Sequence, residues 1–270
     1  MPIDYRLLGK ANGDFRMYPG TPKEDDWWRN TERSLFGGSY PDVHAAYRAR
    51  CGRMTRNIVE VKKGDKSWMK SGHNWIFVTE DYADGIVSWS TGEALMIANA
   101  DCPVLMIWDL ETGLLAFLHC ALQTLVPPDG SDGIVMTFFK KYWLTETMHA
   151  SLAFGINRCC YGFAKSVPPC TANSLVTAWP IGTAIGIDPA NERYGKPSID
   201  LFALMEAQLL TLGMKPDMII SNAKSTLRCT SCKRDCGGNY THWSNARDGK
   251  ETGRNLAFAI RIPDIREKYC

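Results

Sequence analysis

Histidine is scarce in this sequence, with five residues in a chain of 270. That number is too small for the histidine-rich trinuclear sites with which multicopper oxidases reduce dioxygen to water, so this mechanism is disfavoured. Long apolar runs are also missing, because no stretch reaches the ~18 uncharged apolar residues of a membrane-spanning helix and the first residues have no apolar core of the export-signal type. The sequence therefore predicts a soluble, cytoplasmic protein with no membrane partner.

Motifs that bind nucleotide phosphates are absent as well. No GxGxxG or Walker-type loop occurs, and a formal charge of +2 arises from 31 basic and 29 acidic residues without a dense basic run. No nucleic-acid partner is therefore expected. Because no linker rich in Pro, Gly or Ser and no internal repeat divides the chain, we predict a single domain over residues 1–270, for which the 45% hydrophobic content allows a sizeable core.

Cysteine, in contrast, is abundant, with ten residues at irregular spacing. Without an export signal, such a set indicates reduced thiols and a metal site rather than a disulfide framework. Cys229, Cys232 and Cys236 lie in a Gly-rich loop, and His242 follows six residues later. This spacing is typical of a small structural zinc knuckle, and the alternative is a local loop of reduced thiols.

Residues 93–120 are the most informative stretch. They contain three apolar segments of buried-strand length, at residues 94–99, 104–108 and 114–120. If residues 110–113 close a hairpin, Cys102 and His119 meet at its open end, where opposed Cβ atoms lie roughly 4.5–5.5 Å apart. Two interpretations are open: a site that carries chemistry, or the more common arrangement of a small hydrophobic thiol beside a core histidine.

Other segments complete an α/β pattern. Strands are predicted at residues 75–79, 86–89, 150–156 and 218–221, and helices at 134–144 and 199–212, the second ended by Gly213. Residues 42–54 have apolar positions at helical spacing after Asp42, a residue favoured at N-caps, and predict a surface helix with His44 facing solvent. The fold class predicted is α/β, a single layered domain with mixed β-sheets flanked by helices.

The order of several short motifs resembles that of the laccase-domain family, whose members are described as polyphenol oxidases, peptidoglycan-editing factors and purine nucleoside phosphorylases. The motifs are His73, Ala83-Asp84, Gly92-Glu93-Ala94-Leu95, Ala100-Asp101-Cys102-Pro103-Val104-Leu105, Leu118-His119, Cys229-Thr230, Arg247-Asp248-Gly249 and Thr252-Gly253-Arg254. They cover most of the chain after residue 70. The resemblance implies a laccase-domain fold, similar to that of the necrotizing-factor deamidases, and an active site in which His73, Cys102 and His119 bind zinc.

The loop after the second histidine departs from the family. Members normally continue with Ala-Gly-Trp-Arg-Gly, whereas this chain has Cys120-Ala121-Leu122-Gln123-Thr124. The Gln-x-His-Gly around the first histidine is likewise replaced by Ser71-Gly72-His73-Asn74. With the usual Arg lost, Arg247 is the best remaining cation to hold phosphate or a ribose oxygen through paired hydrogen bonds. The alternative is a surface Arg paired with Asp248 in a turn.

One thiolate and two imidazoles form a good zinc set, and three protein ligands leave a fourth position for water. Zinc lowers the pKa of such a water to near neutrality. The resemblance therefore implies an enzyme of purine nucleosides that carries out phosphorolysis of the N-glycosidic bond, adenosine deamination or both, with purine nucleoside and phosphate as small-molecule substrates. Copper is the alternative metal, because imidazole and thiolate also suit it, and a copper-dependent polyphenol oxidase is the corresponding alternative function.

Two further hypotheses involve no metal-dependent catalysis. Cys102 and His119 would serve as nucleophile and general base in an amidase or deamidase, as in the necrotizing-factor enzymes. A non-catalytic binding protein on the same scaffold is suggested by the altered loop after His119. His73 distinguishes the metal-dependent enzyme from the Cys–His amidase or deamidase, because a metal site needs this histidine as a third ligand and a Cys–His dyad does not.

Overall fold

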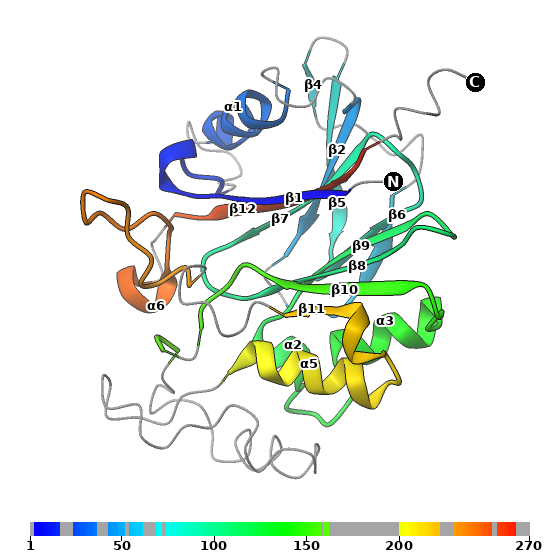
Figure 1. Cartoon of the computed structure of the whole chain (residues 1–270). Helices are drawn as coiled ribbons and strands as arrows, with labels where there is room; N and C mark the ends of the chain where they lie inside the picture. The colour runs from blue at the N-terminus through cyan, green and yellow to red at the C-terminus, as the bar shows by residue number, and fades with distance from the viewer. Residues whose placement is uncertain are drawn as a thin grey trace.

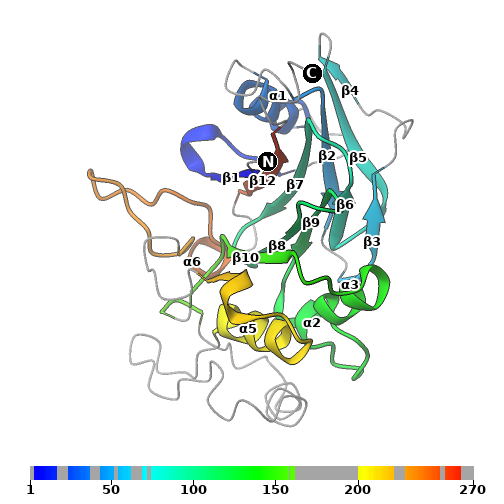
Figure 2. The same cartoon turned by 45° about the vertical axis from the view of Figure 1, so that its right-hand side comes forward.

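The computed structural model describes residues 3–16, 24–36, 43–51, 54–61, 69–71, 74–157, 159–161, 200–221, 229–249 and 253–262. These residues form two six-stranded sheets that face each other, with helices on the outer side of each (Figures 1 and 2). None of the helices in the described ranges has both the length and the apolar composition that a membrane span requires.

The first sheet contains both ends of the described chain. Its strands run in the order β1 (Ile3–Leu8), β12 (Asn255–Arg261), β7 (Glu93–Asn99), β2 (Ala45–Arg50), β5 (Asn74–Tyr82) and β4 (Met69–Ser71). Strand β2 is parallel to both of its neighbours, β5 and β7, whereas the other pairs are antiparallel. The sheet is therefore mixed, as predicted.

The second sheet contains the predicted hairpin. Its order is β11 (Ile219–Ser221), β10 (Met148–Ala153), β8 (Val104–Asp109), β9 (Leu114–His119), β6 (Gly85–Ser88) and β3 (Ile58–Glu60). The central pairs are antiparallel, and the two outermost pairs, β10 with β11 and β3 with β6, are parallel. Strands β8 and β9 pair from Val104 opposite His119 to Asp109 opposite Leu114, so the hairpin prediction is confirmed.

The helices make the outer layers. Helix α1 (Glu24–Leu35) covers the first sheet, and α2 (Leu122–Leu125), α3 (Ile134–Tyr142) and α5 (Leu201–Thr211) cover the second (Figure 1). Helix α5 begins where the Asp200 carboxylate accepts the backbone N–H groups of Phe202 and Ala203, at 3.1 and 3.0 Å, and it ends before Gly213 at φ +95°. The predicted α/β layered fold is thus confirmed.

Within the described residues, three large apolar cores lie between the four layers. The middle core receives side chains from both sheets, such as Ile97, Met106 and Phe117. Because strands such as β9 are buried on both faces, their sequence is continuously apolar rather than alternating. A core that both sheets share agrees with one domain, although the boundaries at residues 1 and 270 stay a prediction.

The helix predicted at residues 42–54 is wrong. Residues Ala45–Arg50 form β2, a central strand with neighbours on both edges. Its apolar side chains are buried on both faces, and this density of apolar residues imitates a helical pattern. Arg48 is also buried, where its Nη2 donates to the Phe15 carbonyl at 2.6 Å and its guanidinium lies 4.6 Å from the Trp27 ring centre. His44 faces solvent, as predicted.

Candidate metal centre

The open end of the β8–β9 hairpin brings three chain segments together. His119 ends β9, and its backbone N–H donates to the carbonyl of Asp84, just before β6, at 2.7 Å. The next residue, Cys120, donates its N–H to the carbonyl of Pro103 at 2.8 Å. The Asp101-Cys102-Pro103 corner, the Asp84 corner and His119 are therefore fixed to one another through backbone hydrogen bonds.

A buried carboxylate orients the histidine. The Nδ1 atom of His119 lies 3.0 Å from Asp84 Oδ1, and the Asp84 side chain is 1% exposed. The other oxygen, Oδ2, accepts the Arg56 backbone N–H at 3.0 Å and the Thr55 hydroxyl at 3.4 Å. Burial by itself raises the pKa of Asp84, but the hydrogen bonds from His119, Arg56 and Thr55 hold it below its ordinary value. With Nδ1–H bound to this carboxylate, Nε2 is left as the atom for a ligand.

Cys102 is the second partner of the imidazole. Its side chain lies near enough to His119 to raise the pKa of the imidazole, and it is only partly buried. Burial lowers the pKa of His119, but the negative charges and hydrogen bonds of Cys102 and Asp84 outweigh it and raise this pKa to about 10. The metal-free site thus favours a protonated imidazole beside the Asp84 carboxylate.

A third side chain at this place is Cys51, which directly follows β2. Potential ligand atoms of Cys51, Asp84 and His119 all lie within 4.8 Å of one another. Burial raises the pKa of Cys51 well above its ordinary value, so its thiol is neutral in the metal-free protein. Cys102 does not belong to this group of three, although its charge raises the pKa of His119.

The structure thus brings together two of the three predicted ligands, Cys102 and His119. His73 lies outside the described residues. Sequence reasoning did not assign a role to Asp84 or Cys51. Asp84 carried a signal, since an acidic and glycine-containing corner directly precedes a buried strand, but Cys51 carried none once its surroundings were interpreted as a helix.

Comparison with known proteins assigns the chain to a family. A family model described as multi-copper polyphenol oxidoreductase laccase matches residues 41–262. The chain belongs to this laccase-domain family. By sequence it matches no curated protein.

Solved structures of bacterial proteins share the laccase-domain fold. YlmD from Geobacillus stearothermophilus is 19% identical with a TM-score of 0.68, and the match covers 97% of this chain and 91% of that one. The hypothetical protein YfiH from Bacillus licheniformis is 16% identical with a TM-score of 0.66, covering 96% and 92%. Protein NMB0706 from Neisseria meningitidis is 17% identical with a TM-score of 0.66, covering 97% and 91%.

In this laccase-domain chain, Asp101 joins the cysteine corner to the carboxyl-terminal loop. Its carboxylate accepts the Thr230 hydroxyl at 2.9 Å and the Ala246 backbone N–H at 2.7 Å, and its backbone carbonyl accepts the Ile156 N–H at 2.7 Å. Burial raises the pKa of Asp101 to about 6 against the lowering effect of these hydrogen bonds. The position of Cys102 therefore depends on residues far away in sequence.

Arg247 lies in the short helix α6 (Asn245–Asp248) of the same loop. Its guanidinium donates to the backbone carbonyls of Ser231 at 2.7 Å and His242 at 2.8 Å, and it also pairs with Asp248. It lies 3.8 Å from the centre of the Tyr240 ring. These contacts brace the loop, and a contact with substrate stays a prediction.

The donor set fits a transition metal. A thiolate and an imidazole with one free nitrogen are ligands that zinc and copper accept, and the carboxylate behind the imidazole is the usual partner of a metal-bound histidine. This laccase-domain chain therefore has the side chains of a metal centre at the hairpin end.

Proposed function

We propose that this chain is a zinc-dependent enzyme of purine nucleosides, with the metal held by His73, Cys102 and His119. The observation that carries the proposal is the Asp84–His119–Cys102 arrangement, in which the imidazole is oriented by a carboxylate at 3.0 Å and lies beside a thiol. Such a carboxylate–histidine pair fixes the tautomer and increases the basicity of the ligating nitrogen.

Zinc is preferred over copper for two reasons. A site with one thiolate and two imidazoles leaves a fourth position open, as catalytic zinc sites do. Five histidines in the whole chain are also too few for a trinuclear copper site, despite the name of the family. Copper at the same three ligands is the second choice, and metal analysis separates the two.

The protein side chains would have distinct tasks. Asp84 would keep Nδ1 of His119 protonated and leave Nε2 available to bind the metal, and Asp101 holds the corner that carries Cys102. When bound, zinc supplies a Lewis acid and lowers the pKa of water to near neutrality. The neutral thiol of Cys51 adds no further charge beside the site.

Two reactions suit such a site. In adenosine deamination, water adds to C6 of the purine and ammonia leaves, which gives inosine. In phosphorolysis, a phosphate oxygen forms a bond to C1′ of the ribose while the bond from C1′ to the purine nitrogen breaks, and the free base takes up a proton. Dependence of product formation on added phosphate tells the two reactions apart.

The experiment combines metal analysis and product analysis. The purified protein is incubated with adenosine, inosine or guanosine, with and without phosphate, and bases, ribose phosphate and ammonia are measured beside zinc content. We expect His73→Ala and Cys102→Ser to lose turnover and the zinc ion held at this centre, while the circular dichroism spectrum stays unchanged. A wild-type protein that holds zinc but converts no purine nucleoside would refute the proposal and favour a binding protein.

A second candidate is a Cys–His amidase or deamidase, and one observation favours it. Cys102, His119 and Asp84 lie in the order nucleophile, base and orienting carboxylate, and His119 Nδ1 is 3.0 Å from the Asp84 carboxylate. In this case, release of ammonia from glutamine side chains would survive both a chelator and His73→Ala, but alkylation of Cys102 would abolish it. The zinc enzyme would show the opposite sensitivity to the chelator.

A further inference from the structure

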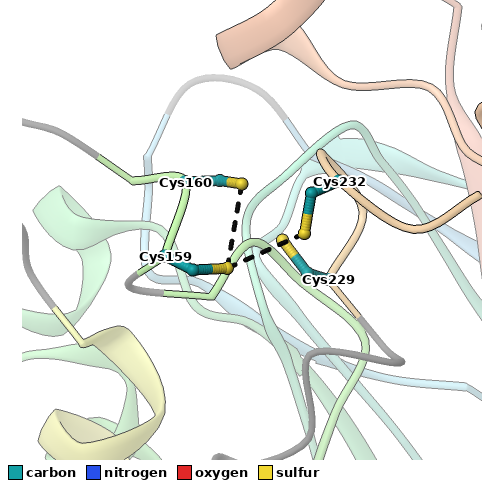
Figure 3. A group of neighbouring side chains, drawn as sticks. All are labelled: Cys159, Cys160, Cys229 and Cys232. Carbon is teal, nitrogen blue, oxygen red and sulfur yellow. Dashed lines mark hydrogen bonds between the residues drawn. The ribbon is translucent and has the colours of Figure 1, made fainter. Parts of the chain in front are cut away.

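We propose that Cys159, Cys160, Cys229 and Cys232 bind a structural zinc ion through four thiolates, at a site separate from the candidate catalytic centre. The sulfur atoms of all four lie within 4.8 Å of one another (Figure 3). Cys159 and Cys160 follow β10, and Cys229 and Cys232 lie in the carboxyl-terminal loop, with Cys159 and Cys232 73 positions apart.

The sulfur spacing matches a metal tetrahedron. With zinc–sulfur bonds of about 2.3 Å, the edge of a regular tetrahedron is about 3.8 Å. The distance from Cys159 Sγ to Cys160 Sγ is 3.7 Å, and that from Cys159 Sγ to Cys232 Sγ is also 3.7 Å. A disulfide would require about 2.0 Å, and all four cysteines are free thiols.

Backbone turns place the adjacent cysteines on one side. The N–H groups of Cys160 and Tyr161 both donate to the Asn157 carbonyl, at 2.9 and 3.1 Å, which makes a tight turn around Cys159. In the partner segment, the Lys233 N–H donates to the Cys229 carbonyl at 3.1 Å, so that the C-x2-C pair also folds back. Each segment therefore presents two sulfurs to a common point, as zinc knuckles do.

The surroundings are those of a closed site. Cys160 and Cys229 are buried, and together with Ile156 they form a small apolar cluster with Tyr161 packed against it. The backbone N–H of Asn157 donates to Cys229 Sγ at 3.4 Å, a contact of the kind that stabilises a metal thiolate. Four sulfurs without an open position indicate a structural ion rather than a catalytic one.

The zinc knuckle suggested by the sequence thus needs a different partner set. Cys229 and Cys232 belong to the group, but Cys236 is exposed and outside it. His242 is also outside, and its Nδ1 lies 2.8 Å from the Thr241 hydroxyl. The missing ligands come from Cys159 and Cys160.

This ion would support the cysteine corner of the candidate catalytic centre. Gly155 forms an isolated parallel bridge with Cys229, and its carbonyl accepts the Thr230 N–H at 3.0 Å. Gly155 also packs so tightly on Pro103 that an added Cβ would lie 2.7 Å from the Pro103 Cα. Joining the two cysteine pairs therefore fixes the segment against which the corner of Cys102 rests.

The test separates the two sites by working in the Cys102→Ser background, where the candidate catalytic site is disabled. We expect this variant to retain one zinc ion per chain. Adding Cys232→Ser to it should lower the zinc content to that of a buffer blank. The matched control is Cys236→Ser, which changes a thiol of the same loop outside the group and should leave zinc unchanged. Loss of zinc in Cys236→Ser, or its retention in Cys232→Ser, would overturn the assignment.

A spectroscopic measurement avoids dependence on the folding of the cluster variants. Zinc X-ray absorption of the Cys102→Ser protein should fit four sulfur neighbours at about 2.3 Å. A first shell of nitrogen and oxygen around the zinc would contradict the four-thiolate site. A metal-free protein in which two of the four cysteines fail to react with a thiol reagent after denaturation would also contradict it, and would identify a disulfide instead.

Discussion

Replacing Asp84 by Asn tests the orientation of the candidate ligand His119. Both carboxylate oxygens act as acceptors, Oδ1 for His119 Nδ1–H and Oδ2 for the Arg56 N–H and the Thr55 hydroxyl. An amide keeps only one acceptor oxygen. If its NH2 group faces Arg56, a buried donor is left unpaired; if it faces His119, the imidazole must carry its proton on Nε2, where the metal would bind.

The orientation in which the amide NH2 faces His119 determines how much zinc affinity is lost. Loss of a carboxylate partner behind a ligating histidine typically weakens metal affinity by about 10- to 100-fold, or roughly 1.4–2.7 kcal/mol. We expect this range for the zinc ion that Cys102→Ser removes. It is measured by dialysing wild-type and Asp84→Asn protein against increasing chelator and determining the zinc that each retains.

Asp109→Asn is the matched control. Asp109 ends β8 at the far end of the same hairpin, is fully buried, and accepts the hydroxyls of Thr145 at 2.8 Å and Thr147 at 3.0 Å. The same chemical change there should lower the free energy of unfolding but leave zinc affinity unchanged. Wild-type zinc retention in Asp84→Asn, or equal weakening in both variants, would refute the reasoning.

Four further predictions follow from individual contacts. Burial raises the pKa of Asp109, but hydrogen bonds hold it below its ordinary value. Its carboxylate therefore stabilises the fold above pH ~4, and this contribution is lost as the pH falls further. Urea unfolding at pH 7 and pH 3 should show that Asp109→Asn lowers the free energy of unfolding mainly at pH 7. Gly155→Ala should lower the free energy of unfolding by about 1–3 kcal/mol through the clash with Pro103, which thermal or urea unfolding measures, and an unchanged midpoint would show that the corner yields. Cys51→Ser should keep its zinc, and loss of zinc in this variant would make Cys51 a ligand. Arg247→Lys should spare zinc and lower the unfolding midpoint, because a Lys cannot replace the bonds to two carbonyls and a carboxylate; an increased KM for phosphate at an unchanged midpoint would instead make Arg247 a substrate contact.

Local sequence signals predicted most of the second sheet and two of its helices, α3 and α5, but neither β3 nor α2. The apolar runs around residues 104–108 and 114–120, separated by a turn with Gly113 at φ +80°, define the hairpin without help from the rest of the chain. The terminating Gly213 likewise marks the end of α5 within about two residues. Such features depend on neighbours in sequence, and sequence patterns detect them.

The first sheet shows where local signals failed. Strand β2 is covered on both faces and on both edges, so its residues carry no alternation, and Arg48 is tolerated in the interior because Phe15 and Trp27 supply an acceptor and an aromatic face. None of these partners is near in sequence. The helix was therefore predicted wrongly because the contacts that make this segment a strand come from residues distant in sequence, which local propensity does not register.

The candidate sites divide in the same way. The sequence by itself placed Cys102 beside His119, because a hairpin fixes the separation of its two open ends. Only the tertiary structure added Asp84 and Cys51, which pairing between β6 and β9 and the position of β2 bring to that end. The four-thiol cluster needed it even more, since Cys159 and Cys232 are 73 positions apart and meet only after β10 and the carboxyl-terminal loop have packed together. Spacing in sequence specifies a site when one local element carries all its ligands, and it cannot do so when packing of distant segments supplies half of them.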